Sequence, residues 1–516
     1  MTAVVPVRAG PVRAARVLPM SAGRLLRLEL HRNPMALMLP LLFVLFWFDT
    51  YRGSMALPAL WSARALPLEQ GSDVVDLAPF VAGVAAWVGS RDGRRGTGEQ
   101  VASTALPRWK AQITAWAAVT CWSMAGYLAC VGALYAVTAS QGAAGHPLWW
   151  PVVVGAVAMA AFSALGFAAG ALIPSRFTAP LTAIAALLAL FATFKATSAY
   201  TLVSPMDPPH SIAAPAPDAG VFSPYLPDLS VVQILFLLGL VLAALGVLGM
   251  ADRYAGRWLR SAAVIVTVAG LAAAGTGLAL AGTAKVQPNG VAIPALHDAA
   301  SDRPVSYQPA CEQAAIPVCL NPVYLSYLPA ISAALDPVLS QFAGLPGAPV
   351  RVTQAAFSSV SSSPSSATVT GDPAVLSLSF NIGHQGSICN PQTAACVSWT
   401  TFWKTPAYIA GAVRPEAATA ILRDLVGDAS PAQQAISAAL LMAARVPLTS
   451  PGSAQALAPD GAQYLGGTIV LGPARGSPVY SAALRFAALG AATRHTWLSA
   501  HLAALHAGQV TLVEIP

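Results

Sequence analysis

Charged residues are scarce in this chain. Asp, Glu, Lys and Arg together make up only 9% of the 516 residues, whereas hydrophobic residues make up 56%. Soluble globular domains carry about one quarter charged residues, so the composition excludes an ordinary soluble protein. The mean hydropathy of +0.61 agrees. We therefore predict a multi-pass protein of the cell (plasma) membrane, with membrane lipid as its surroundings.

Signatures of chemistry are also missing. The chain has no G-x-x-x-x-G-K-[ST], so it cannot hold ATP in a P-loop of its own. It has no G-x-S-x-G and no HExxH, which are typical of serine hydrolases and zinc proteases. We therefore assign no catalytic residue, no metal ligand and no cofactor to this chain. The net charge of +7 comes from Arg clusters beside apolar runs, which are topology signals, so nucleic acid is not an expected partner.

Long apolar runs are what the sequence does contain. Because about 20 apolar residues cross the roughly 30 Å hydrocarbon core, residues 34–283 are expected to form an all-α transmembrane domain. Its predicted spans lie at about 35–51, 74–90, 111–138, 149–173, 178–199, 230–251 and 261–283. The second is the weakest, and a re-entrant segment is the alternative to a full crossing there. No charge inside the spans marks a polar pathway, so the sequence predicts no substrate.

The basic residues indicate the orientation of these seven runs. The segments 1–33, 91–110, 174–177 and 252–260 hold 15 Lys and Arg against four acids, and the other loops and span ends before residue 284 hold three against seven. Cytoplasmic loops are rich in Lys and Arg, so the N-terminus is expected inside and the C-terminus outside. The residues that set this orientation in the second loop are Arg91, Arg94, Arg95 and Lys110.

The N-terminal tail, residues 1–33, is strongly basic. Ser21 can cap a short helix through His31, with leucines on one part of its surface and basic residues on another. Such a helix is suited to lie in the membrane interface. A disordered cytoplasmic tail is the alternative.

Residues 288–516 are predicted to form one extracytoplasmic α+β domain. Apolar runs become shorter there and Pro, Ser and Gly separate them. Helical patterns lie at 323–343, 415–427, 431–445 and 478–507, and strand-like runs at 349–355, 374–380, 397–403 and 466–472. Residues 358–366 form a Ser-rich loop.

Four of the six cysteines lie in this exported domain: Cys311, Cys319, Cys389 and Cys396. An oxidising compartment favours disulfides, and the short separations favour the pairs Cys311–Cys319 and Cys389–Cys396. Zinc is the alternative, although no C-x-x-C spacing is present. Cys121 and Cys130 fall inside the third span, where they act as small apolar residues.

The polar loop from Arg91 to Lys110 divides the second and third spans. Gly96 and Gly98 permit a tight turn, and Thr97 can cap a short helix that Pro107 ends. Arg108 and Lys110 then return the chain to the lipid headgroups. On these grounds alone the loop can be a simple connector that fixes topology.

The same loop carries a family resemblance. The core Arg95-Gly96-Thr97-Gly98-Glu99, followed by Ala105-Leu106-Pro107-Arg108, resembles the permease subunits of ABC-2-type exporters over about residues 20–250. The basic helix ahead of the first span is similar to the elbow helix of that family. The resemblance implies that the loop docks on an ATP-binding subunit through Gly96, Thr97, Glu99, Pro107 and Arg108.

Two departures from the family pattern are present. Only Asp92 stands for the usual acidic residue ahead of the Gly-Thr, and a seventh span carries a large exported domain. The segment from Val318 to Tyr324 is similar to exported domains attached to actinobacterial ABC permeases.

The leading hypothesis is therefore the permease half of an ATP-driven exporter. ATP and Mg²⁺ would bind a separate ABC ATP-binding subunit, and a second permease half would complete a homo- or heterodimer. The chain itself would be a transport subunit and not an enzyme. The alternative is a membrane-anchored receptor, scaffold or degenerate ectohydrolase that displays residues 288–516.

Overall fold

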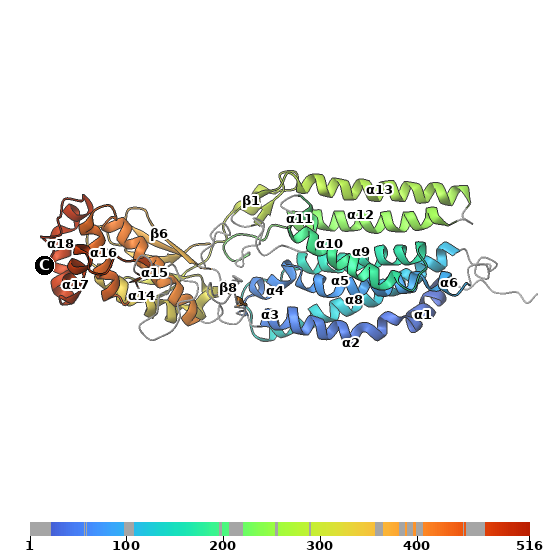
Figure 1. The fold of residues 1–516 in the computed structure, drawn as a ribbon, viewed down its shortest axis with the longest axis horizontal. Coiled ribbons are helices and arrows are strands. Elements are labelled where there is room, and N and C mark those ends of the chain that lie inside the picture. The colour runs from blue at the N-terminus through green and yellow to red at the C-terminus, as the bar shows by residue number, and fades with distance from the viewer. Residues whose placement is uncertain are drawn as a thin grey trace, which may run out of the picture.

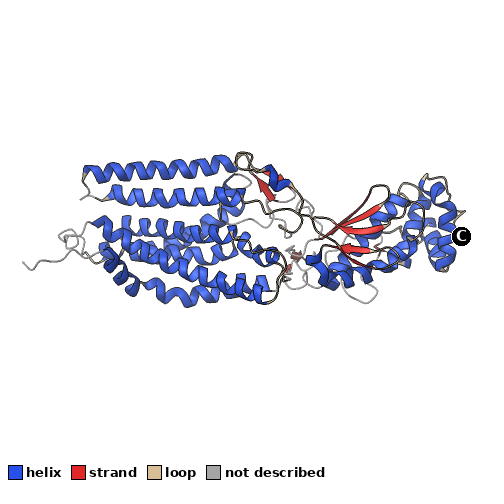
Figure 2. Cartoon of the chain, turned by 180° about the vertical axis from the view of Figure 1, so that it is seen from behind, coloured by secondary structure: helices blue, strands red, loops and turns tan. Residues whose placement is uncertain are grey.

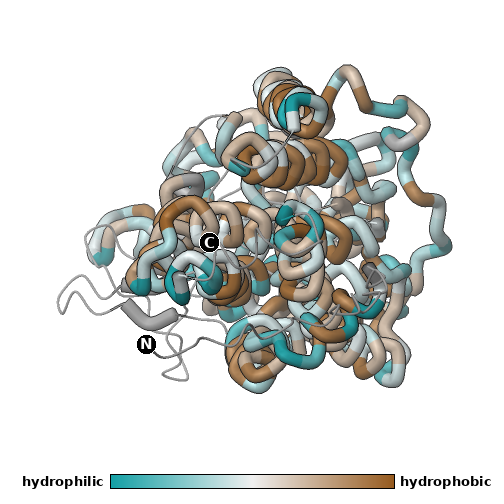
Figure 3. Tube along the Cα trace, turned by 90° about the vertical axis from the view of Figure 1, so that its right-hand side faces the viewer, coloured by the Kyte–Doolittle hydropathy of each residue, from teal (hydrophilic) through white to brown (hydrophobic). Residues whose placement is uncertain are grey.

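The computed structural model describes residues 22–516 except 56, 58, 97–107, 196–198, 206–219, 253–255, 288–289, 357–364, 381–386, 390–395, 399–405, 447 and 450–469. The molecule is elongated, with a bundle of long helices at one end and a mixed helix and sheet body that contains the C-terminus at the other (Figure 1, Figure 2). Viewed end-on in Figure 3, the coils of the bundle are largely brown, the colour of apolar residues. The bundle therefore has the composition of a membrane domain.

The bundle contains short and long helices. In chain order they are α1 (Ala22–Arg32), α2 (Pro34–Phe46), the π-helical turn η1 (Trp47–Tyr51), α3 (Arg52–Met55), α4 (Trp61–Glu69), α5 (Ser72–Gly89), α6 (Arg91–Arg94), α8 (Arg108–Ser140), α9 (Trp150–Leu172), α10 (Thr178–Lys195), α11 (Ala199–Val203), α12 (Asp228–Ala251) and α13 (Arg257–Ala281). Asn33 and Pro34 begin α2 as their residue types predict: the Asn33 side chain caps the helix and Pro34 stands at its first turn.

Seven helical stretches in the described part of the chain are long and apolar enough to cross a membrane: Pro34–Met55, Trp61–Gly89, Arg108–Ser140, Trp150–Leu172, Asp228–Ala251, Arg257–Ala281 and Pro322–Phe342. The first six coincide with predicted spans. The predicted span 178–199 corresponds to α10, whose apolar part, Thr178–Ala192, is shorter. The seventh stretch was predicted as a helix of the C-terminal domain, and it lies in that body.

The second predicted span is preceded by a short helix that the sequence did not predict. Before α5, the chain forms α4, which is buried over most of its length. Gly71 joins the two helices with a φ of 70°, a conformation that glycine adopts readily. Together α4 and α5 follow the long direction of the bundle (Figure 1). This arrangement favours a crossing over the re-entrant alternative.

Small residues bring α5 and α9 into close contact. A Cβ on Gly166 would overlap the backbone of Ala82, and one on Gly170 would overlap the backbone of Ala86. Each pair is four residues apart, so the two helices meet along one stripe. Such small-residue stripes let membrane helices approach closely. The G-x-x-x-G of the sequence therefore packs within this chain.

The C-terminal body contains a five-stranded sheet in the order β3-β4-β5-β7-β6. The strands are β3 (Ala310–Glu312), β4 (Val318–Leu320), β5 (Arg351–Gln354), β6 (Ser365–Thr370) and β7 (Val375–Phe380). β4, β5 and β7 are parallel, while β3 and β6 pair antiparallel at the edges. β6 begins inside the predicted Ser-rich loop, so the end of that loop was predicted wrongly. Its Ser366 faces Ser379 of β7, hydroxyl to hydroxyl, at 2.7 Å.

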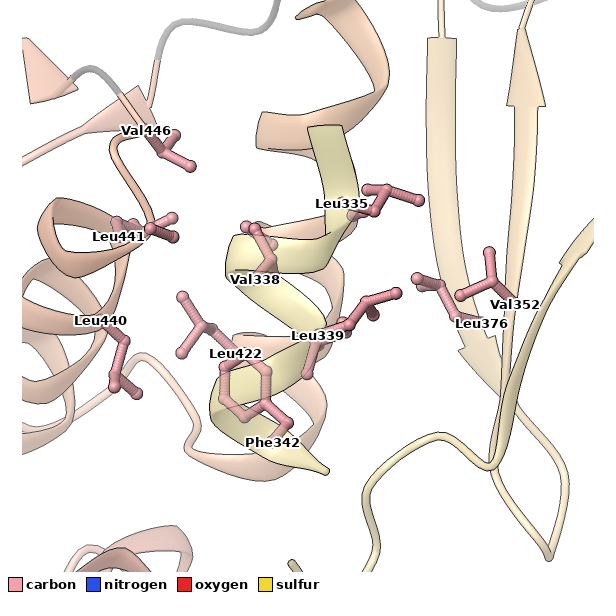
Figure 4. Close-up of a cluster of buried hydrophobic side chains, with 14 of the residues drawn as sticks. Leu335, Val338, Leu339, Phe342, Val352, Leu376, Leu422, Leu440, Leu441 and Val446 are labelled. Carbon is pink, nitrogen blue, oxygen red and sulfur yellow. The ribbon is translucent and has the colours of Figure 1, made fainter. Parts of the chain in front are cut away.

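Helices complete this body, and the first two of them pack against the sheet. They are α14 (Leu328–Phe342), preceded by the 3-10 turn η3 (Pro322–Tyr327), then α15 (Pro406–Leu425), α16 (Pro431–Ala443), α17 (Pro478–Ala488) and α18 (Ala491–His506). Figure 4 shows Leu335 and Leu339 of α14 directed at Val352 and Leu376 of the sheet. Since these side chains are fully buried there, α14 belongs to a protein core and not to a lipid-facing span. The predicted helix 478–507 is in fact two helices, because Leu489 and Gly490 are extended.

Smaller strand pairs complete the fold. β1 (Lys285–Gln287) pairs with β2 (Gly290–Ala292), β8 (Ser387–Cys389) with β9 (Cys396–Ser398), and β10 (Leu448–Thr449) with β11 (Val470–Leu471). A 3-10 turn, η2 (Ala299–Asp302), follows the first hairpin.

The two parts of the molecule are joined by packing as well as by the chain. Phe222, from the connection ahead of α12, stacks on Tyr324 with ring centroids 6.3 Å apart and meets Tyr307 edge-on at 5.8 Å. Its carbonyl accepts the N–H of Val305 at 2.8 Å. The connection therefore contacts the C-terminal body directly.

Candidate functional site

The basic end of the bundle, opposite the C-terminal body, is the candidate site. It brings together α1, α6, the start of α8 and the turn between α9 and α10 (Figure 1). The turn Arg91–Gly96 lies directly on the α9–α10 turn, because a Cβ on Gly93 would overlap the Pro174 ring. Segments far apart in the sequence thus form one surface.

Arg91 joins this surface to the N-terminal helix. Its guanidinium donates to Glu29 of α1 through two nitrogens, with Nη1–Oε2 at 3.1 Å and Nη2–Oε1 at 3.0 Å. The hydrogen bond to Glu29 raises the pKa of Arg91 above its ordinary value. Two parallel N–H···O bonds fix orientation as well as distance. Arg91 therefore holds α1 against the loop. This contact is additional to the predicted role of Arg91 in setting the orientation in the membrane.

A second contact holds α1 at the next residue. The indole N–H of Trp122, in α8, donates to the carbonyl of Leu30 at 2.9 Å. Asn33 then turns the chain, since its side chain accepts the N–H of Met35 at 2.9 Å. The predicted short helix between Ser21 and His31 is thus present as α1. Its contacts with α6 and α8 give it a fixed place in the bundle.

Arg94 packs within the protein at this end. Its guanidinium carbon lies 3.5 Å from the centre of the Trp87 ring, and its Nη2 donates to the Trp87 carbonyl at 2.9 Å. Lys110 similarly lies over Trp109, with Nζ 5.5 Å from the ring centre. Aromatic rings attract such cations. Both residues are therefore held by tryptophans at the end of the bundle.

The predicted coupling loop begins and ends on this surface. Arg95 closes α6, and Gly96 follows with a φ of +66°, where a side chain would be strained. Arg108 begins α8. Thr97, Glu99 and Pro107 lie outside the described residues. The structure therefore places both ends of the loop, and the Arg91 end lies against α1.

The predicted disulfides have different outcomes. Cys311 and Cys319 form a disulfide with an S–S distance of 2.12 Å, between paired β3 and β4, so this prediction is confirmed. Cys389 and Cys396 are directly opposite in the β8–β9 register, and their disulfide remains a prediction. Cys121 and Cys130 are free in α8. Within the described ranges no group of three or more His, Cys, Asp or Glu side chains is placed to hold a metal ion, and the absence of a metal site stays a prediction.

The other end of the bundle holds charged residues that we expected in loops. Asp73 is 0% exposed and Arg64 is 5% exposed. The Arg64 guanidinium donates to Met55 Sδ at 2.8 Å and to Gln141 Oε1 at 2.9 Å. Arg64 and Asp73 therefore lie buried within Trp61–Gly89, a stretch long and apolar enough to cross a membrane, whereas the predicted spans left both residues in a loop. The available sequence signal was Asp73 and Asp76, three residues apart at the start of a short apolar run.

A histidine lies at the junction with the C-terminal body. His297 Nε2 lies 3.0 Å from Asp302 Oδ1, and His297 Nδ1 lies 3.4 Å from Oδ2 of Asp228, the first residue of α12. The same Asp228 oxygen accepts the N–H of Ile293 at 2.9 Å. The hydrogen bond to Asp302, followed by the charge of Asp228, raises the pKa of His297.

The chain matches no protein-family model, no curated protein and no solved structure. The arrangement of its own residues is therefore the basis for a functional assignment.

Proposed function

We propose that the chain is the membrane-spanning permease subunit of an ABC-2-type, ATP-driven exporter. In this proposal the basic end faces the cytoplasm and receives an ATP-binding subunit, which binds ATP and Mg²⁺. A second permease half, identical or different, completes the path through the membrane. The chain moves its substrate by changing conformation and performs no chemistry itself.

One observation carries the proposal. The Arg91–Glu29 ion pair joins the turn that opens the predicted coupling loop to α1, the helix expected to lie in the membrane interface. Arg108, at the other end of the loop, opens α8, a helix of 33 residues. Such a helix is about 50 Å long, so a force applied to the loop reaches deep into the bundle. This is the arrangement needed to couple a partner to movement of the spans.

The proposed orientation places seven crossings between the basic end and the C-terminal body. They are α2, α4 with α5, α8, α9, α10, α12 and α13. A membrane-impermeant maleimide on intact cells tests it, in a chain with Cys121→Ser, Cys130→Ser, Cys389→Ser and Cys396→Ser. We expect label on Asp336→Cys, an exposed position of the C-terminal body, and none on Ser175→Cys, in the α9–α10 turn. The reverse pattern would invert the proposed topology.

The function itself is tested by association with an ATPase. The full-length chain is purified in mild detergent, and co-purifying proteins are searched for a G-x-x-x-x-G-K-[ST] sequence. We expect such a subunit, with ATPase activity that depends on the permease. The double variant Thr97→Ala, Glu99→Ala should reduce its recovery about tenfold, the effect of roughly 1.4 kcal/mol of lost contact.

Arg257→Gln is the matched control. Arg257 is an exposed cation at the same end of the bundle, at the start of α13, so its loss changes the charge but not the loop. It should retain the partner. If no P-loop protein associates, or if both variants retain it equally, the exporter proposal fails and the receptor or scaffold alternative takes its place.

A further inference from the structure

At the end of the bundle nearer the C-terminal body, acidic side chains converge on a buried position. Asp73, in the first turn of α5, is 0% exposed. Asp76 follows one turn later, and its carboxyl lies against that of Asp49 in the π-helical turn η1. Short π-helical turns occur frequently at functional sites. Neither oxygen of Asp73 has a hydrogen-bond partner.

An independent feature points at the same place. The hydroxyl of Tyr127, from α8, lies beside the Asp73 carboxyl and is itself without a hydrogen-bond partner of ordinary geometry. Tyr127 is only 1% exposed. A buried carboxylate is costly unless an opposite charge or a full set of hydrogen bonds compensates it. The Tyr127 hydroxyl alone is not such a set, so a proton or another small ligand is expected at the Asp73 carboxyl.

Little space is available for that ligand. A Cβ on Gly155, in α9, would overlap the Tyr127 hydroxyl and would lie 3.1 Å from Asp73 Oδ2. Gly155 therefore lies close against both groups, and a side chain there would displace them. An organic cation would have to push α9 away from α5 and α8. A proton fits without any movement.

The position is also deep enough to exclude bulk water. Gly155 lies five residues beyond the start of α9 at Trp150, which is about 8 Å along a helix. Trp149 and Trp150 have the character of an interfacial aromatic pair. The site is therefore on the hydrocarbon side of the interface, where ionisable residues usually mark a pathway or a relay.

The neighbouring groups favour a neutral Asp73. The titratable side chains that interact with it are Asp76 from α5 and Tyr127, Cys130 and Tyr135 from α8. Asp49 from η1 and Arg64 and Glu69 from α4 belong to the neighbouring elements. Three of these seven are carboxylic acids, and Asp73 forms no ion pair with any residue that the structure describes. The helix dipole at the start of α5 stabilises a negative charge on Asp73. This stabilisation is small compared with the free energy needed to bury that charge.

We propose that Asp73 is a proton-binding site within the membrane bundle, with Tyr127 as its hydrogen-bonding neighbour. The Asp49–Asp76 pair provides the route toward the end of the bundle that faces the C-terminal body. Because the bound proton can leave only when Asp73 meets water or a cation, its release accompanies an opening of α5 against α8 and α9. This inference does not depend on the proposed function.

Infrared spectroscopy of the full-length chain in lipid nanodiscs tests the proposal, since a protonated carboxyl has a carbonyl stretch that a carboxylate lacks. At neutral pH we expect this band in the wild type, the loss of one component of it in Asp73→Asn, and a change in the frequency of that component in Tyr127→Phe. Any component that comes from the Asp49–Asp76 pair is identified by its loss in Asp76→Asn. The control is Asp336→Asn, which removes an exposed carboxyl of α14 and should leave the band unchanged.

Several results would contradict the proposed proton site. A band that Asp73→Asn leaves unchanged, or no band in the wild type, overturns the proposal. If Asp73→Asn does not fold, an unchanged frequency in Tyr127→Phe overturns it instead. A metal cation is tested by adding Na⁺ or Ca²⁺ at constant ionic strength. A rise in the thermal midpoint that Asp73→Asn abolishes would make the site a metal site and reject the proton.

Discussion

Single residues decide how α12 meets the C-terminal body. His297 lies between Asp302 and Asp228, so its positive charge attracts two carboxylates at once. One of these begins α12 and the other belongs to the turn η2. Protonation of a single imidazole therefore strengthens the contact between the membrane bundle and the start of the C-terminal body.

This contact depends on pH with a definite sign. Because the folded pKa of His297 is raised, its contribution to stability is fully present below the unfolded pKa of about 6.5. The contribution is lost as the pH rises through the raised folded pKa. We expect His297→Gln to lower the thermal midpoint at about pH 6 and to differ less from the wild type at alkaline pH.

The comparison needs a second histidine variant. His146 is exposed in the loop between α8 and α9, and His146→Gln should match the wild type at each pH. A difference for His297→Gln that grows with pH, or one that does not change, would contradict the predicted sign.

At the residue scale, the sequence indicated the chemical character of the important residues, but not the residues that they contact. The basic character of Arg91 and Arg94 was evident, and so was their position next to a span. The partner of Arg91 was not, because Glu29 is 62 residues away and nothing local links the two. Asp73 was placed in a loop for the same reason, since its burial comes from α8 and α9 and not from its own neighbours.

At the scale of elements, close helix packing depends on glycine. Gly170 faces the backbone of Ala86 with no room for a side chain. We expect Gly170→Leu to destabilise the bundle by about 1–3 kcal/mol, the usual effect of overpacking a core. The measurement is the thermal midpoint of the full-length chain in detergent.

Gly275→Leu is the matched control. Gly275 lies in α13, a helix of the same bundle, and a Cβ there meets nothing within 4 Å. Its midpoint should not fall. If Gly170→Leu leaves the midpoint unchanged as well, α5 and α9 do not pack as described.

Elements were predictable where composition alone defines them. Apolar length located six of the candidate spans, because a membrane helix needs few specific contacts to be recognised. α4 was missed, since Arg64, Pro67 and Glu69 make a polar pattern whose burial only tertiary packing provides. The break at Gly490 was missed because the apolar pattern continues through it from α17 into α18.

At the scale of the whole molecule, Phe222 determines how firmly the two parts are joined. It is 8% exposed between Tyr307 and Tyr324. We expect Phe222→Ala to cost about 3 kcal/mol and to increase hydrogen exchange in residues 305–327, where its ring packs. Val513→Ala removes a 92% exposed side chain and should change neither measurement. Unchanged exchange in Phe222→Ala would mean that the Phe222 ring does not hold the two parts together.

The contacts around Asp228 allow α12 to transmit a tilt within the bundle to the C-terminal body. Its first residue is tied to Ile293 and His297, and its 24 residues extend about 36 Å toward the basic end. A tilt of about 10° around the basic end would swing Asp228 sideways by about 6 Å. The C-terminal body would move sideways together with this end of α12. A fluorescent probe on that body would then read out the state of the bundle from a domain that lies entirely outside it.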